Sequence, residues 1–463
     1  MQSRDDVKNI ADHSLVATAL GSDAAKDYLS TLSERGVTAS KEALANLATL
    51  DQPLSEWGAT VEDIIGDLHS IGSPATTATA GGRFFGLVVG GTLPAALGAR
   101  MLSSAWDQVV FNDATSPIGA RMEQVAGRWV LEALDLPSEC AVGFVTGSTM
   151  GTFLCLAAAR HQLLAKGGWN VEERGLWGAP QLRVIASEEV HVTVKKALSM
   201  LGIGTSIIET VKTDNNGAML LEEIPVLDAN CIIVTQAGNV NSGSVDPIGS
   251  ICEAANRVGA WVHVDGAFGL WGAASSDHKY MFEGMQNADS WVTDGHKWLN
   301  TPYDCGISIC KHPDAIHAAM ATVAPYLKAG AVAQPKDMVP EFSRSARAVE
   351  VWAALKSLGR SGVAELVQGC SLHANHLAER LRKLGWTVEN DVVLNQVVAT
   401  HPSLKGKLAD LSAEVRASGE AWFSTTNWKG QEAVRFSVSS WATTRSDIDR
   451  LVVAIDNAMA NHL

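Results

Sequence analysis

The sequence contains few cysteines, and their spacing predicts neither a disulfide framework nor a zinc site. The seven cysteines are scattered, their number is odd and no two of them form a CxxC pair, so we interpret them as buried thiols. Apolar runs near the roughly 20 residues that a membrane span requires are absent, and no charged-then-apolar leader opens the chain. We therefore expect a cytoplasmic protein without a metal site.

Clusters of basic residues are missing as well. The chain has 36 Lys and Arg against 50 Asp and Glu, which gives a formal net charge of −14. A nucleic acid or an anionic membrane surface would require a basic patch, so we expect neither as a partner. The acidity mainly favours solubility.

The length of 463 residues predicts about three compact units. We expect residues 1–75 to form a helical N-terminal arm, because apolar residues between Leu47 and Leu68 recur mostly at every third or fourth position. Such an arm would pack against the body or contact a second subunit.

Residues 76–315 show a different pattern, in which short apolar strands alternate with helices. The candidate strands lie at 183–186, 231–234 and 261–264, and a polar or glycine-rich segment follows each of them. This succession predicts an α/β fold with a mostly parallel central sheet flanked by helices.

Residues 316–463 are expected to form a smaller α+β C-terminal domain. The periodicity predicts helices at 346–358 and 373–384, and then strands at 392–399 and 433–438. The segment 328–340 has little periodicity and predicts a mobile loop.

Asp265 and Lys297 are the most informative pair of residues in the chain. Asp265 follows the apolar run 260–264, and ligands of open α/β sheets bind at that end of a strand. Lys297 lies among apolar residues such as Trp291 and Trp298, where an uncompensated ammonium would be costly. A Schiff base between a lysine and pyridoxal 5'-phosphate removes that difficulty, and a carboxylate beside the pyridine nitrogen lets the ring accept electrons. We therefore predict this cofactor, with both residues catalytic.

Gly147, Ser148 and Thr149 form a candidate phosphate loop. They lead directly into an apolar helix at 153–159, and the free amides at the start of a helix point at an anion. Gly and Ser also serve as ordinary helix-start residues. The position upstream of both other cofactor candidates favours phosphate binding.

Two histidines are further candidates. His191 could stack on the cofactor ring, on the face opposite Asp265 and Ala267, or it could be a structural residue at a helix start. His296 could contact the phosphate or simply orient Lys297.

Thr235 and Arg435 also have two interpretations each. Thr235 could contact the 3-oxygen of the pyridine ring or belong to an ordinary turn. Arg435 could bind a substrate carboxylate or pair with a nearby acid.

With these residues in place, the chain resembles the group II pyridoxal-phosphate-dependent amino acid decarboxylases, which include aromatic amino acid, glutamate and histidine decarboxylases. The resemblance runs from about residue 80 to the end of the chain. The motifs that carry it are Phe84-Phe85-Gly86, Ser116-Pro117 with Glu123, Gly147-Ser148-Thr149, the segment 187–196 with His191, Val262-His263-Val264-Asp265-Gly266-Ala267, His296-Lys297-Trp298-Leu299 with Tyr303-Asp304-Cys305, and the run from Arg435 to Thr444.

The resemblance implies a fold type I, transferase-like architecture and a homodimer with its active sites at the subunit interface. It supports the roles given above for Lys297, Asp265, Ala267, His191 and the loop at 147–149. The implied reaction is decarboxylation of an L-amino acid to the corresponding amine. The alternatives are a carbon–carbon lyase or aldolase on the same fold, a less closely matching aminotransferase, and a cofactor-binding protein without turnover.

Two departures from the family pattern concern the reaction and the substrate. Relatives that act on aromatic amino acids carry a loop tyrosine that protonates the carbanion, whereas the segment 328–350 has no tyrosine. Tyr326 and His191 are alternative donors, and an oxidative, aldehyde-forming reaction is a further alternative.

The second departure lies in the segment 86–91, which is aliphatic where aromatic-specific relatives carry rings. We expect Phe84, Phe85, Leu87 and Val88 to bind the substrate together with Arg435. An aromatic substrate does not follow from these residues.

Overall fold

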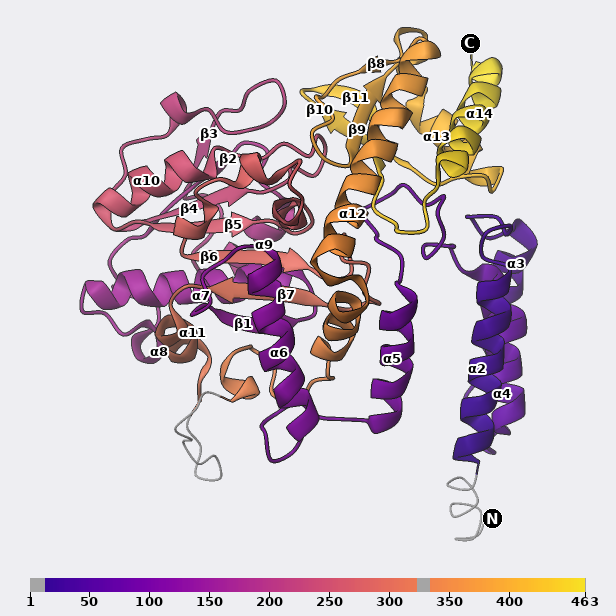
Figure 1. Cartoon of the computed structure of the whole chain (residues 1–463), viewed down its shortest axis with the longest axis horizontal. Coiled ribbons are helices and arrows are strands. Elements are labelled where there is room, and N and C mark those ends of the chain that lie inside the picture. The colour runs from indigo at the N-terminus through magenta and orange to yellow at the C-terminus, as the bar shows by residue number, and fades with distance from the viewer. Residues whose placement is uncertain (1–12, 323–333, 463) are drawn as a thin grey trace.

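The computed structural model describes residues 13–322 and 334–462, which contain two β-sheets linked by a long helix (Figure 1). The larger sheet has seven strands in the order β1-β7-β6-β5-β4-β2-β3. Its strands are β1 (Ala141–Val145), β2 (Arg183–Ser187), β3 (Ile208–Val211), β4 (Cys231–Gln236), β5 (Trp261–Asp265), β6 (Ser290–Asp294) and β7 (Gly306–Cys310). Strand β7 runs antiparallel to both of its neighbours, β1 and β6, and the other neighbouring pairs are parallel. The predicted mostly parallel sheet and its three candidate strands are confirmed.

Helices cover both faces of this sheet. Successive residues of each strand point to opposite faces, and residues on both faces are buried. In β4, for example, Ile232 and Val234 face one hydrophobic core and Ile233 faces the other. The first core includes α7 (Ser148–Lys166), α9 (Val192–Met200) and α11 (Pro313–Met320). The second core includes α5 (Pro94–Trp106), α6 (Pro117–Ala133), α10 (Ile248–Val258) and part of α12 (Ala348–Lys383). The short helix α8 (Val171–Arg174) packs beside α7.

The smaller sheet is antiparallel, with the strand order β10-β11-β9-β8. Its elements are β8 (Thr387–Val388), β9 (Gln396–Thr400), β10 (Ser424–Trp428), β11 (Gln431–Ser437), α13 (Leu408–Ala417) and α14 (Arg445–His462). The two helices and the second part of α12 bury their apolar residues against it. The strands predicted at 392–399 and 433–438 correspond to β9 and β11, with shifted boundaries.

Helix α12 contains the two helices predicted at 346–358 and 373–384, but the second helix begins directly after the break at Gly359 and is therefore longer than predicted. It runs from Ala348 to Lys383 and is broken at Gly359, where φ is 62° and ψ is −176°, a conformation that essentially only glycine adopts. The stretch after the break is helical because Val363, Val367 and Cys370 pack into the core. Such tertiary packing overrides the weak helix propensity of the glycines in this stretch.

The N-terminal region is helical but packs loosely on the rest of the molecule. Helices α2 (Ser14–Ser30) and α4 (Val61–Asp67) lie side by side, and α3 (Lys41–Asn46) lies at one end of the pair (Figure 1). A cavity of ≈ 1150 Å³ lies between this region and α5. Large apolar side chains on the region are exposed, including Leu15, Leu44, Leu50, Leu54, Trp57 and Leu68.

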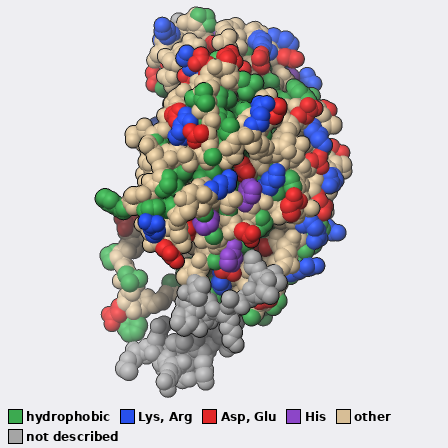
Figure 2. Space-filling model, turned by 90° about the vertical axis from the view of Figure 1, so that its left-hand side faces the viewer, with side chains coloured by type: hydrophobic (Ala, Val, Ile, Leu, Met, Phe, Trp, Pro, Cys, Tyr) green, Lys and Arg blue, Asp and Glu red, His purple; other side chains and the backbone are tan. Residues whose placement is uncertain are grey.

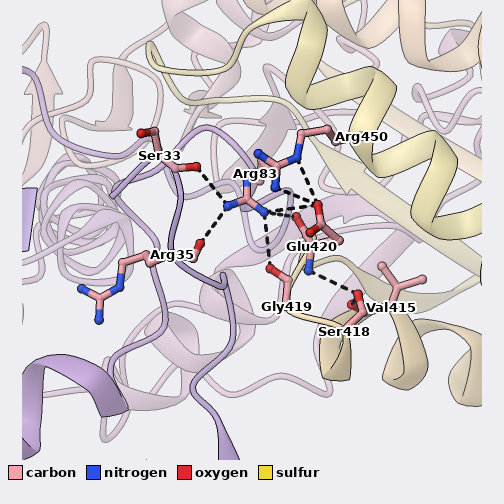
Figure 3. A network of polar contacts seen from close by, with 8 residues as sticks. All are labelled: Ser33, Arg35, Arg83, Val415, Ser418, Gly419, Glu420 and Arg450. Atoms are coloured by element: carbon pink, nitrogen blue, oxygen red, sulfur yellow. Dashed lines mark hydrogen bonds and ion pairs between the residues drawn. The ribbon is translucent and has the colours of Figure 1, made fainter. Parts of the chain in front are cut away.

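Arg83 connects the N-terminal region to the smaller sheet (Figure 3). Its guanidinium is buried and donates to the carbonyl oxygens of Ser33 at 3.1 Å, Arg35 at 2.7 Å and Glu420 at 2.7 Å. Arg450 in turn donates to the Glu420 carboxylate at 2.9 Å. Burial lowers the pKa of Arg83, and the neighbouring positive charge of Arg450 lowers it further. One side chain therefore satisfies carbonyl groups from two distant segments of the chain.

The loop predicted at 328–340 lies partly outside the described residues, as does Tyr326. In its described part, residues 335–337 form a single helical turn. None of the described helices is long and apolar enough to cross a membrane.

Candidate active site

The candidate site lies at the edge of the large sheet where β5 and β6 end. Asp265 is the last residue of β5 and Asp294 is the last residue of β6, and the two strands are parallel neighbours. The N-terminus of α7 reaches the same edge, because an ideal Cβ on Gly147 would lie 3.8 Å from the Oδ1 atom of Asp294. Ligands bind at such strand ends in open α/β sheets.

Lys297 lies in the turn after β6, and its closest acidic partner is Asp294. The Lys297 Nζ atom is 3.4 Å from Asp294 Oδ2, and the side chains are 19% and 2% exposed, respectively. The backbone of the turn is fixed by Asn300, whose N–H and side-chain amide both donate to the Lys297 carbonyl oxygen, at 3.1 and 3.2 Å. The lysine is thus mostly buried and held on a rigid turn.

Asp265 is a buried carboxylate with few partners. It is 6% exposed, and its Oδ1 atom accepts a hydrogen bond from the Ala267 N–H at 3.2 Å. The Ala267 carbonyl oxygen accepts from the Asp294 N–H at 2.8 Å. Ala267 therefore ties the end of β5 to the end of β6, and this fixes the two carboxylates relative to each other.

The phosphate loop predicted at 147–149 forms the start of α7. No side chain caps this helix, so its first amide groups remain available to an anion. Gly147 has an extended backbone with φ of 176°, and an ideal Cβ on it would lie 3.5 Å from the ring of His296. Ser148 is buried and Thr149 is partly exposed. The loop and His296 are therefore neighbours, as a shared phosphate site requires.

His191 caps the N-terminus of α9, since its Nδ1 atom accepts from the Thr193 N–H at 3.4 Å. Burial lowers its pKa, and the nearby charge of Asp265 offsets part of this effect, while Lys297 and Arg435 add to it. The ring is therefore mainly neutral at pH 7. His191 has a structural role as a helix cap and also lies within electrostatic reach of the site.

His296 is held from both sides. Its Nδ1 atom accepts from the Cys305 N–H at 3.0 Å, and its Nε2 atom lies 3.6 Å from Asp294 Oδ2. The ring of Tyr303 stacks on it, with the centroids 4.2 Å apart. Burial lowers the pKa of His296, whereas burial and the charge of Asp294 raise the pKa of Tyr303 to about 12.

Thr235 is not brought together with the other candidates. In the parallel register of β4 and β5, Thr235 is opposite Val264, while Gln236 is opposite Asp265. Neighbouring residues of a strand point to opposite faces, so Thr235 and Asp265 lie on different faces of the sheet. The Thr235 hydroxyl is fully buried and donates to the His263 carbonyl oxygen at 3.4 Å.

The expected substrate residues near position 85 are divided between core and surface. Phe85 is completely buried with the apolar core of the smaller sheet, and Phe84 stacks on Trp422 with the centroids 4.7 Å apart. Val88 is also buried, so only Leu87, at 57% exposed, offers its side chain to the surroundings. Phe85 is therefore a core residue in this structure.

The backbone of the same segment supports the turn that carries Lys297. Leu87 and Val88 both have positive φ, at 54° and 58°, which is strained for a β-branched residue such as Val88. This turn brings Gly90 so close to Lys297 that a Cβ on Gly90 would overlap the Lys297 carbonyl group. The segment therefore acts on the site mainly through its backbone.

Arg435 is a partly buried cation without a carboxylate partner among the described residues. Its Nη1 atom donates to the Val240 carbonyl oxygen at 3.4 Å, and its Nε atom is buried without a partner. Burial lowers its pKa. An anionic ligand would compensate this charge. The alternative, an ion pair between Arg435 and a nearby acid, is not seen in the part of the chain described.

Asp294, Gln236 and Gly90 are the residues at the site that the sequence reasoning missed. Asp294 stands three positions before Lys297, a separation that allows contact within one turn. Gln236 shares the sheet face of Asp265, which the alternation of the strand would have indicated. The contact of Gly90 with Lys297 joins residues far apart in the chain, and no local signal predicts it.

A family model and relatives of known sequence match much of this chain. The family model described as the pyridoxal-dependent decarboxylase conserved domain matches residues 44–398. "Tyrosine/DOPA decarboxylase 5" from Papaver somniferum is 27% identical over 356 residues, which cover 71% of this chain and 66% of that protein. The present chain thus spans slightly less than two thirds of the poppy protein's length.

Two solved structures share the whole architecture. The crystal structure of Oryza sativa TDC with PLP and tryptamine superposes with a TM-score of 0.87 at 21% identity, covering 99% of this chain and 98% of that one. Mouse CSAD gives the same TM-score and identity, with coverage of 96% and 99%. At these identities the likeness shows a common fold.

Proposed function

Because the chain belongs to the pyridoxal-dependent decarboxylase family, we propose that it uses pyridoxal 5'-phosphate on Lys297 to remove the carboxylate of an L-amino acid as carbon dioxide. The family expected from the sequence motifs is thereby confirmed, and with it the fold type I architecture. The observation that carries the proposal is the convergence of Lys297, the strand-end Asp265 and the uncapped start of α7 at one sheet edge.

The residues present fit the cofactor. Its phosphate would lie at the start of α7, where Gly147 leaves room and the first amides have no side-chain cap. Its ring nitrogen would face Asp265, whose carboxylate accepts only one hydrogen bond among the described residues. We propose that His191 and Ala267 contact the two faces of the ring. Thr235 is the one cofactor candidate whose position, on the other sheet face, does not fit.

Each group of the protein then has one task. When bound, pyridoxal phosphate supplies an aldehyde for Lys297 and a ring that accepts the electron pair left by the departing carbon dioxide. The Asp265 carboxylate would hold a proton at the ring nitrogen. The turn after β6 would keep Lys297 at the site, and the amides at the start of α7 would bind the phosphate.

Arg435 is proposed to bind a carboxylate of the substrate. This carboxylate is either the α-carboxylate that is lost or a second carboxylate on the side chain of an acidic substrate. A guanidinium that held the departing α-carboxylate would stabilise the substrate and oppose its loss. A second carboxylate on the substrate side chain would gain the same charge-assisted hydrogen bonds without that cost. The buried Nε atom without a partner supports an anionic contact of one of these kinds.

A second candidate function is oxidative decarboxylation to an aldehyde. The observation that favours it is the absence of tyrosine from residues 328–350, because the proton donor of the ordinary reaction would be missing. His191 is then a candidate donor at the site, and burial keeps its ring mainly neutral. Aldehyde formation with oxygen consumption would identify this outcome.

The test is a survey of products. Full-length protein loaded with pyridoxal phosphate is incubated with pooled acidic, basic, aliphatic and aromatic amino acids, and amines, aldehydes and carbon dioxide are measured by mass spectrometry. We expect an amine and carbon dioxide in equal amounts. Lys297→Ala should form neither product and lose the cofactor absorbance. An aldehyde with an amino fragment would indicate a carbon–carbon lyase, and no carbon dioxide from any pool would refute the proposal.

A second copy of this chain is the proposed macromolecular partner. The exposed apolar side chains of residues 13–75 and the ≈ 1150 Å³ cavity beside α5 form a surface suited to a protein contact. On the face seen in Figure 2, acidic and basic side chains are interspersed, so that face presents no basic patch to a nucleic acid. Size-exclusion chromatography with light scattering tests the dimer, and a fully active monomer would contradict it.

The remaining expectations stay predictions. We retain the division into an arm at 1–75, a cofactor domain at 76–315 and a small domain at 316–463 as a proposal. A cytoplasmic location is in keeping with the seven cysteines, all of which are free and buried.

A further inference from the structure

Asn300 lies where three distant segments of the chain meet, and its contacts extend beyond the Lys297 carbonyl group described above. It is completely buried and closes the turn that carries Lys297. Its φ is 58°, in the left-handed region that asparagine enters more readily than most other residues. Because the residue is buried, the polar atoms of its side chain need partners inside the protein.

Both ends of the Asn300 side-chain amide bind the segment that follows β11. Its Nδ2 atom donates to the Ser439 carbonyl oxygen at 3.0 Å and, within the lysine turn, to the Trp298 carbonyl oxygen at 2.9 Å. Its Oδ1 atom accepts from the Trp441 N–H at 2.9 Å. One side chain thus joins the lysine turn to the C-terminal region through a donated and an accepted hydrogen bond.

The segment before α5 completes this arrangement. The Leu93 N–H donates to the Asn300 carbonyl oxygen at 2.8 Å, and the indole Nε1 atom of Trp441 donates to the Thr92 carbonyl oxygen at 2.9 Å. Each of the three segments is therefore hydrogen-bonded to the other two. We call this arrangement the Asn300 junction, and it comprises residues 90–93, 297–300 and 439–441.

The junction connects Lys297 to Arg435, the residue proposed to contact the substrate. Arg435 belongs to β11, whose position is fixed separately by its pairing with β9 and β10. Ser439 lies just after the end of this strand. Loss of the Asn300 side chain would therefore release the lysine turn from the continuation of β11 and leave Arg435 in its sheet.

We propose that Asn300 is a positioning residue that fixes Lys297 relative to Arg435, because it binds the lysine turn to the segment that continues β11. The inference rests on the proposed function in taking Lys297 as the cofactor lysine and Arg435 as a substrate contact. A shift of about 1 Å at a reacting group can lower the rate by about 10²-fold. Substrate binding through Arg435 survives such a shift, so the effect falls on kcat rather than on KM.

Two variants of Asn300 separate its backbone from its side chain. Asn300→Gly keeps the positive φ without strain and removes every hydrogen bond of the side-chain amide. Asn300→Asp keeps the size of the side chain and the acceptor for the Trp441 N–H, but it replaces the Nδ2 donor with an oxygen atom that faces carbonyl oxygens. Such a contact is repulsive, so the turn and the C-terminal segment should separate.

Asn395→Ala is the matched control. Asn395 is also completely buried, and its Nδ2 atom donates to the Val438 carbonyl oxygen and to the Ser439 Oγ atom, both at 3.0 Å. The substitution therefore removes a buried amide from the same C-terminal segment, while the hydrogen bonds between Asn300 and the lysine turn stay in place.

The first experiment compares the wild type with these three variants as full-length proteins loaded with pyridoxal phosphate. It measures kcat and KM for the substrate found in the product survey, and circular dichroism in the absorption band of the cofactor, which reports the orientation of the bound chromophore. Both Asn300 variants should show an altered dichroism, a kcat lower by at least about tenfold and a KM changed by less than about threefold. Asn395→Ala should keep the wild-type kcat and dichroism.

Three results would overturn the inference. The first is a wild-type kcat and dichroism in either Asn300 variant. The second is a higher KM at an unchanged kcat, since that result would place Asn300 in substrate binding. The third is an equal loss of kcat in Asn395→Ala, which would assign the effect to a general loosening of the C-terminal segment.

Hydrogen exchange of the wild type tests the junction even if the Asn300 variants fail to fold. The amides of Leu93, Asn300 and Trp441 all donate within the junction. As denaturant is added, these amides should become exchangeable at the same concentration, because they belong to one cooperative unit. If the Trp441 amide opens at a lower concentration than the Asn300 amide, the two segments move independently and the inference fails.

Reduction with borohydride and peptide mapping distinguish this inference from the proposed function. If the reduced cofactor is found on a lysine other than Lys297, the proposed function fails, and the inference fails with it. If the cofactor is found on Lys297 while Asn300→Gly keeps the wild-type kcat and dichroism, the inference alone fails.

Discussion

Replacing Gly90 tests whether the site depends on a close backbone contact that cannot be predicted from the local sequence. The strained turn at Leu87 and Val88 presses Gly90 against the turn that carries Lys297. An alanine Cβ at position 90 would lie 2.8 Å from the Lys297 carbonyl carbon and 2.9 Å from Asn300 Nδ2, and it would overlap the carbonyl oxygen. Gly90→Ala must therefore push the lysine turn away or distort the 86–91 segment.

The size of the effect follows from the overlap. The Cβ would lie 1.6 Å from the Lys297 carbonyl oxygen, and non-bonded atoms normally rest about 3.5–4.0 Å apart, so the turn has to move by about 2 Å. Overpacking of this kind typically costs about 1–3 kcal/mol of stability. A displacement of about 1 Å at a reacting group can lower the rate by about 10²-fold. We expect both effects, with the larger loss in turnover.

The assay compares three proteins by thermal unfolding, cofactor absorbance and turnover of the substrate found in the product survey. Gly369→Ala is the matched control, because Gly369 lies in helix α12 and a Cβ there meets no atom within 4 Å. It should gain up to about 1 kcal/mol from improved helix propensity. If Gly90→Ala unfolds and turns over like the wild type, the turn is not held by this contact and the reasoning is wrong.

Three further predictions concern single side chains. Asp265→Asn should keep the cofactor absorbance but lower turnover by about 10²-fold or more, because an amide cannot hold the ring nitrogen in its protonated form; a near-normal rate would remove Asp265 from that role. Arg435→Met should raise KM by about 10- to 100-fold, since charge-assisted hydrogen bonds contribute about 1.5–3 kcal/mol, and leave the melting temperature unchanged or higher; an unchanged KM would exclude a substrate contact. Burial lowers the pKa of His263 to about 4, below the roughly 6.5 of the unfolded chain, so the unfolded state binds the extra proton and stability falls as pH decreases from about 6.5 to about 4. Denaturant titrations should show the wild type losing about 3 kcal/mol more than His263→Asn between pH 7 and about pH 4, and equal losses would contradict the assignment.

The large sheet and the strand-end position of Asp265 could be predicted from sequence because their signals are local. The run before Asp265 is apolar except for His263, and all five residues of β5 are buried, as expected for a central parallel strand. Lys297 was proposed as the cofactor lysine because the residues around it are apolar. Both inferences need only neighbours within a few positions.

The sequence predictions differ from the structure where the outcome depends on which face of a strand a residue occupies, or on contacts between distant segments. Thr235 and Gln236 are adjacent and both polar, but only the strand register decides which one shares the face of Asp265. Phe85 is an ordinary aromatic residue in the sequence, and it becomes a core residue because its backbone pairs with Trp422 and Ser437, at 2.7 and 2.9 Å. Such pairing between distant segments cannot be recognised from the local amino-acid sequence.

The junction at Arg83 has a consequence for how the protein is made on the ribosome. One of its acceptor carbonyls, in Gly419, lies 336 residues further along the chain. At roughly 5–20 residues per second, the guanidinium emerges tens of seconds before that partner exists. During that interval the Arg83 connection between the N-terminal region and the segment at 419–420 cannot form, so we expect the N-terminal region to become fixed to the rest of the molecule only after residue 420 is synthesised.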